Sequence, residues 1–168
     1  MNQAAIVLNA QKGFLDPEGS FYLGDAVRAV VPGIRDFLAR LREEGAVMVF
    51  TQDWHEPEEP CSGCQSDSPD VEIVEELAEF VSVRVRTKAQ SAFWATDLDK
   101  IIADLDPDPV HLLGVETDRS VLHTAFDLEL RFGDREIMLH RDLVASRDPG
   151  VHECALRIIE GTMRVKIT

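Results

Sequence analysis

Short apolar runs alternate along the chain with segments whose apolar residues recur every three or four positions. The short runs have the length and the pattern of strands with one or two buried faces. The helical spacing is clearest between Pro32, which suits the first turn of a helix, and Gly45, which suits its end. Strands are predicted at 4–8, 46–50, 81–85, 110–115 and 136–139, with an edge strand at 163–167. Helices are predicted between 32 and 45, 71 and 80, 96 and 104, 117 and 133, and 149 and 159.

This alternation of strands and helices predicts an α/β fold with a mostly parallel sheet covered by helices on both faces. The 168 residues are enough for one domain with a sizeable core. No linker, internal repeat or low-complexity segment divides the chain. We therefore expect a single domain over residues 1–168, with three α/β/α layers around a doubly wound sheet.

Polar side chains come just after four of the predicted strands. Asn9 follows the first strand, Asp53 and His55 the second, and Lys88 the third, while Ser120 falls in the first turn of the helix after the fourth. In a doubly wound sheet the carboxyl ends of the strands meet at one crevice, and a helix N-terminus adds free N–H donors there. The pattern favours a ligand-binding crevice, although polar residues are also ordinary at strand ends.

Composition and charge narrow the classes of function. The chain is 45% hydrophobic and 29% charged, which is typical of globular proteins. Its net charge of −14 argues against a nucleic-acid partner, because phosphate backbones are bound by clusters of Lys and Arg. No run is apolar and long enough to cross a membrane, the N-terminus lacks the basic region of a signal peptide, and three cysteines do not make a disulfide framework. We expect a cytoplasmic protein without a membrane partner.

The chain resembles the isochorismatase-like hydrolases, the family that includes nicotinamidases and other cysteine amidohydrolases. Five stretches carry the resemblance, among them Phe-Thr-Gln-Asp-Trp-His and Gly-Val-Glu-Thr-Asp-Arg-Ser-Val, and all five occur in the order and spacing of the family. The five stretches are 5–15, 50–55, 88–98, 114–121 and 142–146. The resemblance implies a mostly parallel six-stranded sheet, a homo-oligomer, and a cis or strained peptide bond between Val115 and Glu116.

The resemblance also locates a catalytic triad, which this chain changes at two of three positions. The family uses an Asp after the first strand, a Lys after the third and a nucleophilic Cys after the fourth; this chain has Asn9, Lys88 and Ser120 there. A carboxamide does not accept a proton near neutral pH, and a Ser hydroxyl, unlike a thiol, needs an adjacent general base. Asn9 also lacks the acidic proton that family members cleaving a vinyl ether use. We therefore expect impaired or lost amidohydrolase activity.

Two functions follow from these substitutions. In the first, which we favour, the crevice is retained as a binding pocket for a small molecule, and Lys88 attracts an anion such as a carboxylate. In the second, the protein is an active hydrolase of a small amide or a related substrate, in which neutral Lys88 is the base for Ser120, as in Ser–Lys pairs on other folds.

Further site residues lie in the same stretches and in the loop at 56–70. We expect substrate contacts from Phe14, Trp54, Phe93, Val115 and Glu116. The resemblance assigns metal binding to the pair at 53 and 55, and zinc is the candidate cofactor. Because zinc prefers four ligands and thiolates are good ones, Cys61 and Cys64 could complete a set with Asp53 and His55. A redox pair or two plain thiols are the alternatives.

Overall fold

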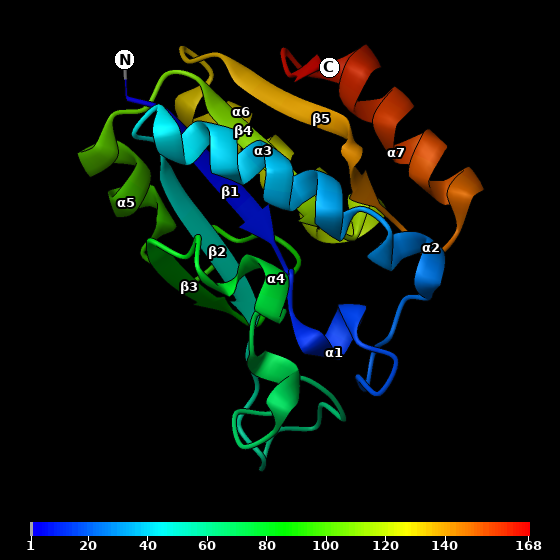
Figure 1. Ribbon diagram of the computed structural model, residues 1–168. Coiled ribbons are helices and arrows are strands. Elements are labelled where there is room, and N and C mark those ends of the chain that lie inside the picture. The colour runs from blue at the N-terminus through cyan, green and yellow to red at the C-terminus, as the bar shows by residue number, and fades with distance from the viewer. Residues whose placement is uncertain (1) are drawn as a thin grey trace.

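A six-stranded, fully parallel sheet forms the centre of the structure, a computed structural model that describes residues 2–168. The strands lie in the order β3-β2-β1-β4-β5-β6, so the chain starts in the middle and builds outward in both directions (Figure 1). Parallel pairing along the whole sheet confirms the predicted doubly wound α/β class. The strands are β1 (Ala4–Leu8), β2 (Val47–Asp53), β3 (Val83–Thr87), β4 (Val110–Val115), β5 (Ile137–Ala145) and β6 (Lys166–Ile167).

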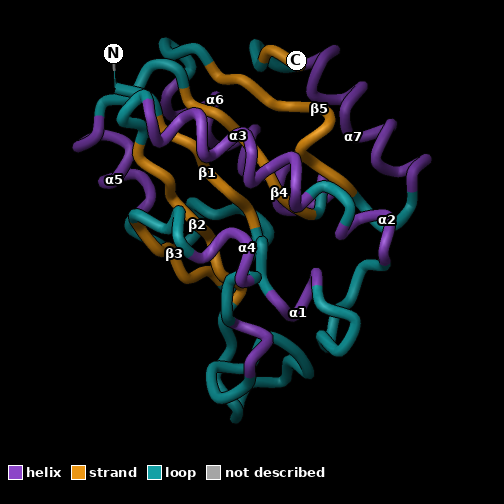
Figure 2. The backbone as a smooth tube through the Cα atoms, in the orientation of Figure 1, coloured by secondary structure: helices purple, strands orange, loops and turns teal. Residues whose placement is uncertain are grey.

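Helices cover both faces of this sheet, which gives the three predicted layers (Figures 1 and 2). Side chains of β1 alternate between the two faces: Ala5 and Val7 join the core under α3, whereas Ile6 and Leu8 join the core on the opposite face. One face carries α1 (Lys12–Leu15), α2 (Asp25–Arg28), α3 (Val31–Glu43) and α4 (Glu75–Ala78). The other carries α5 (Leu98–Leu105), α6 (Leu122–Phe132) and α7 (Pro149–Thr162).

The helix predicted at residues 71–80 is not found as one continuous helix. A single 3-10 turn, η1 (Pro69–Val71), and the four residues of α4 are helical in this stretch. Between them the backbone is extended and pairs with the segment after β1, where the N–H of Val74 donates to the carbonyl of Ala10 and Lys12 donates to Glu72. The weak helical pattern was therefore overridden by pairing with a distant segment.

The strand β5 is the other clear difference, because it continues six residues past the predicted end at 139. An irregularity in the register between Leu112 and Gly114 of β4 lets the second half of β5 pair again, with Val144 opposite Gly114. The middle of β5 carries exposed polar residues, so the apolar pattern did not predict this continuation. The result brings residues 146 and 147 to the carboxyl edge of the sheet.

The backbones of β1 and β4 lie in close contact at the centre of the carboxyl edge. Gly114 has φ +107, and a Cβ at this position would lie 2.1 Å from the carbonyl oxygen of Leu8. Only glycine fits both the conformation and the space. Within residues 2–168, no helix is long and apolar enough to cross a bilayer.

Candidate functional site

A cavity of about 580 Å³ opens at the carboxyl edge of the sheet. This is the edge at which parallel α/β sheets generally bind ligands. The three positions equivalent to the family triad, Asn9, Lys88 and Ser120, all line it, as do Asp53 and His55. The fold therefore gathers the polar strand-end residues of four strands around one space, as the strand pattern predicts.

Asn9 and Ser120 form a buried hydrogen-bonded pair whose direction can be assigned. The hydroxyl of Thr51 donates to Asn9 Oδ1 over 2.9 Å, and the same hydroxyl oxygen accepts from the backbone N–H of Asn9 over 3.1 Å. The Asn9 Nδ2 group therefore faces Ser120 and donates to Ser120 Oγ over 2.9 Å. Because Asn9 supplies the proton of this bond, the proton of the Ser120 hydroxyl is free to point elsewhere.

Asn9 fits this position for a conformational reason as well. Its φ is +49, in the left-handed region that Asn and Asp tolerate better than other side chains. The conformation turns the chain sharply at the end of β1 and directs the side chain toward β4. An Asp could adopt the same backbone, so the neutral amide changes the chemistry of the site without changing its shape.

Ser120 lies in a π-helical turn, η2 (Thr117–Val121), rather than in the first turn of a regular α-helix. The N–H of Val121 donates to the carbonyl of Glu116, five residues back, and α6 continues from there. The peptide bond between Val115 and Glu116 is cis, which confirms the prediction for this bond. Ser120 is 7% exposed, and its hydroxyl is at the cavity wall.

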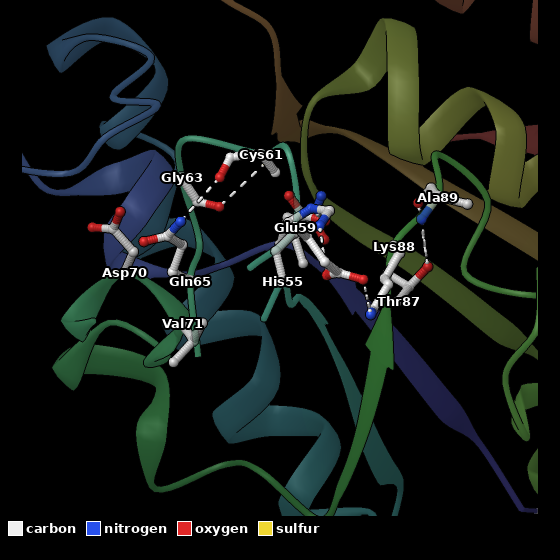
Figure 3. Close-up of polar contacts among 12 residues, drawn as sticks. His55, Glu59, Cys61, Gly63, Gln65, Asp70, Val71, Thr87, Lys88 and Ala89 are labelled. Carbon is white, nitrogen blue, oxygen red and sulfur yellow. Dashed lines mark hydrogen bonds and ion pairs between the residues drawn. The ribbon is translucent and has the colours of Figure 1, made fainter. Parts of the chain in front are cut away.

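Lys88 pairs with Glu59 rather than with the residue at position 9, where the family triad has its Asp. Its Nζ donates to Glu59 Oε1 in the loop after β2, and the side chain is 46% exposed (Figure 3). Lys88 makes no hydrogen bond with Asn9 or Ser120 in the described residues, 2–168. A neutral carboxamide at position 9 does not attract an ammonium as a carboxylate does, so the loop carboxylate holds it instead.

Asp53 and His55 form the second polar pair of the cavity. His55 Nε2 lies 3.1 Å from Asp53 Oδ1, and His55 Nδ1 lies 3.6 Å from Glu59 Oε2. Burial raises the pKa of the Asp53 carboxyl, and the neighbouring His55 works against that rise. Both nitrogens of the imidazole therefore face carboxylates, and Asp53 fixes the orientation of the ring.

The predicted zinc set is not assembled in the structure. Cys61 lines the cavity and its Sγ lies 3.5 Å from the carbonyl of Gly63, but the Cys64 side chain, from the same loop, is fully buried in the core. Burial raises the pKa of the Cys64 thiol, which opposes the thiolate that zinc needs. In the part of the chain from 2 to 168, no three His, Cys, Asp or Glu side chains are grouped to hold a metal ion. Asp53 and His55 are thus two donors, short of the four ligands that zinc prefers.

The residues expected to contact substrate divide into two groups. Phe14 and Glu116 line the cavity. Trp54, Phe93 and Val115 do not: Trp54 turns outward under Arg86, and the other two are buried in the cores on opposite faces of the sheet. Alternation along a strand explains the misses at Trp54 and Val115, because neighbours of a site residue point to the opposite side. Phe93 lies outside the strands, in the turn segment before α5, and packs into the core.

Several cavity residues were not predicted from the sequence, and three of them shape its chemistry. Phe21 stacks on Phe14 with ring centroids 5.7 Å apart and completes an apolar wall. Arg119 and Arg147 add cations, and Arg147 donates to the carbonyl of Tyr22 over 2.6 Å. Arg147 follows β5, so the rule that found the other strand-end residues would have found it if the end of β5 had been predicted correctly.

A family model for the isochorismatase domain matches residues 3–168. The chain belongs to the isochorismatase family. This confirms the resemblance on which the triad-equivalent positions were assigned. Comparison of the sequence with curated proteins finds no significant match.

Solved structures of family hydrolases superimpose closely on this chain. Nicotinamidase/pyrazinamidase from Bacillus subtilis is 24% identical, with all of each chain covered and a TM-score of 0.91. Pyrazinamidase from Pyrococcus horikoshii, solved in complex with zinc, is 28% identical, with 99% of this chain and 98% of the other covered and a TM-score of 0.88. N-carbamoylsarcosine amidase from Thermoplasma acidophilum is 23% identical, with coverage of 100% and 96% and a TM-score of 0.84.

Proposed function

We propose that this isochorismatase-family protein binds a small anionic molecule, such as a carboxylate, in the cavity at Asn9, Lys88 and Ser120, and that its amidohydrolase activity is impaired or lost. The observation that carries the proposal is the direction of the Asn9–Ser120 hydrogen bond. A Ser nucleophile needs a neighbour that accepts its proton. Here the neighbour, Asn9, donates the hydrogen bond to Ser120 Oγ. Ser120 is therefore a hydrogen-bond donor toward the cavity rather than an activated nucleophile.

The charges around the cavity support an anionic ligand. Lys88, Arg119 and Arg147 supply three cations. Of the acidic residues in the lining, Asp53 and Glu116 both have a raised pKa because burial disfavours their charged forms. With Asn9 in place of an Asp, the corner at Lys88 is more positive by one unit than in a relative with the complete triad. These three cations give an anion places to bind in a protein of net charge −14.

Hydrolysis by Ser120 with Lys88 as base is the second candidate, since the family neighbours named above are amidases. It requires Lys88 to be neutral and directed at Ser120. The ion pair with Glu59 turns the ammonium toward the loop. For this reason we favour binding. We retain a homo-oligomer and a cytoplasmic location as parts of the proposal, from the family resemblance and the composition respectively.

Calorimetric titration with benzoate tests the proposal. The carboxylate suits Lys88 and the Ser120 hydroxyl, and the ring suits the wall of Phe14 and Phe21. Replacement of Lys88 by Ala should weaken benzoate binding about threefold to tenfold, in the range of a partly exposed ion pair. Lys100→Ala is the matched control, because Lys100 is an exposed cation on α5 outside the cavity lining.

Two results would contradict anion binding at this cavity. One is the absence of benzoate binding by the wild-type protein. The other is an equal effect of Lys88→Ala and Lys100→Ala, which would show that benzoate senses only the overall charge. Circular dichroism melts of both variants establish that each is folded before the titrations are compared.

A further inference from the structure

Glu59 makes the contacts that a ligand carboxylate would make at this edge of the cavity. Its Oε1 accepts from Lys88 Nζ, and its Oε2 lies 3.6 Å from His55 Nδ1 (Figure 3). Lys88 and His55 both line the cavity, and Glu59 reaches them from the loop between β2 and η1. A carboxylate of the chain itself thus lies between a cation and an imidazole that face the proposed binding space.

The position of Glu59 is set by a short local turn. The N–H of Glu59 donates to the carbonyl of Glu56 over 2.9 Å, and Glu59 Oε2 accepts from the N–H of Glu56 over 2.8 Å. These contacts orient the carboxylate toward Lys88. The hydrogen bond from Lys88 is the main cause that lowers the pKa of Glu59, so the side chain is a full anion near neutral pH.

We infer that Lys88 forms an anion subsite, beside His55, which Glu59 fills in the ligand-free protein, so that a bound carboxylate must compete with this residue of the chain. The inference rests on the proposed function and adds a mechanism that limits affinity at the same site. An anion that enters the cavity takes over the Lys88 ammonium while Glu59 moves out toward solvent. A neutral ligand has no such competition, because it does not need the ammonium.

The Lys88–Glu59 ion pair is strong enough to compete with a ligand carboxylate but weak enough to be displaced by it. Glu59 is 33% exposed and Lys88 is 46% exposed, so solvent screens the pair and offers each partner an alternative. Ion pairs at this level of exposure contribute little to stability. The loop can therefore release Glu59 without disturbing the sheet that holds Asn9 and Ser120.

Substitution of Glu59 by Gln tests the inference, with Glu58→Gln as the matched control. Glu58 is its neighbour in the same loop and is exposed, so the control removes the same charge without touching Lys88. Titration with benzoate should show about fivefold tighter binding by Glu59→Gln than by the wild type, and a much smaller change for Glu58→Gln. Benzamide, the neutral analogue, should bind the three proteins equally. The gain for benzoate should disappear in Glu59→Gln/Lys88→Ala.

The remaining outcomes contradict either this inference or the proposed function. If Glu59→Gln and Glu58→Gln change benzoate binding equally, or if benzamide gains as much as benzoate, Glu59 does not compete for an anion subsite. If the gain persists without Lys88, the subsite is wrongly placed. If wild type binds benzoate through Lys88 but Glu59→Gln brings no gain, the inference fails while the proposed function stands. If no variant binds benzoate, the proposed function itself fails.

Discussion

Two polar clusters, each with at least one buried member, lie at opposite edges of the same sheet, and they differ in whether their hydrogen bonds are complete. At the amino edge, His111 of β4 and His140 of β5 are joined ring to ring, with Gln3 and Thr168 at the two ends. At the carboxyl edge, Asn9, Thr51 and Ser120 form the cluster at the cavity wall. Its Ser120 hydroxyl has a single hydrogen bond within residues 2–168.

The amino-edge cluster is closed because each ring nitrogen has a partner of the right kind. Gln3 Nε2 donates to Glu44, so Gln3 Oε1 accepts from His111 Nε2 over 3.0 Å. His111 Nδ1 then accepts from His140 Nε2 over 2.9 Å, and His140 Nδ1 accepts from the hydroxyl of Thr168. Both rings are neutral in this arrangement, and no donor or acceptor is left for a ligand.

The comparison separates a structural cluster from a functional one. Buried polar groups are normally satisfied inside the protein, and the histidines follow this rule. Ser120, by contrast, keeps a free donor at the wall of a cavity that cations also line. The difference predicts that the amino-edge cluster supports folding, whereas the carboxyl-edge cluster supports ligand binding and contributes little to stability.

Truncation of each cluster should show the largest difference in stability. His140→Ala leaves His111 Nδ1 without a donor in a buried position, and we expect a loss of about 1–3 kcal/mol in the free energy of unfolding. Ser120→Ala removes one hydrogen bond beside a water-accessible cavity, and we expect a loss below about 1 kcal/mol. Urea unfolding of the two variants measures both values. Equal losses, or a larger loss for Ser120→Ala, would remove the distinction between the clusters.

The same histidines should also make the stability depend on pH, with a smaller effect than the truncation of His140. Burial lowers the pKa of His140 to about 4 and also lowers the pKa of His111; His111 and Arg40 add to the lowering at His140, whereas Glu44 and Glu136 oppose it at His111. The unfolded chain, with an ordinary histidine pKa, takes up protons first as the pH falls. The stabilisation by the neutral rings is therefore complete above about pH 6.5 and is lost between about 6.5 and 4, by roughly 1–2 kcal/mol after allowance for partial exposure.

A His140→Gln variant isolates this effect from the titration of carboxylates. Its amide can still donate to His111 Nδ1, but it does not take up a proton in this range. Melting temperatures measured from pH 7 to pH 5 should fall less for the variant than for the wild type. Parallel profiles would mean that His140 does not contribute to the acid sensitivity.

The fold class was largely predictable because its strands are apolar runs that alternate with helical patterns. The positions of Asn9 and Ser120 at one edge followed from the same pattern. The π-helical turn at Ser120 was not predictable, because the spacing of apolar residues does not distinguish it from the start of an α-helix. The end of β5 was missed because its polar middle resembles a loop.

The partners of the site residues were harder to predict than their positions. Nothing in the sequence pairs Lys88 with Glu59, because that contact depends on how an irregular loop folds. Likewise, His111 and His140 are 29 residues apart and meet only through the register of two strands. The expected grouping of Cys61 and Cys64 with Asp53 and His55 depended on the loop in the same way, because the spacing of the two cysteines does not reveal which thiol is buried.

Ammonia release from small amides, measured for the wild type beside Asn9→Asp/Ser120→Cys, tests the central claim most directly. The double variant restores the family triad around Lys88, and Asp tolerates the left-handed backbone at position 9. We expect no release above background by the wild type and a rate at least about a hundredfold higher for the double variant, as expected for recovery of a general base and a thiolate. Release by the wild type that matches the double variant and is abolished by Ser120→Ala would contradict the claim, because Ser120 would then be an active nucleophile.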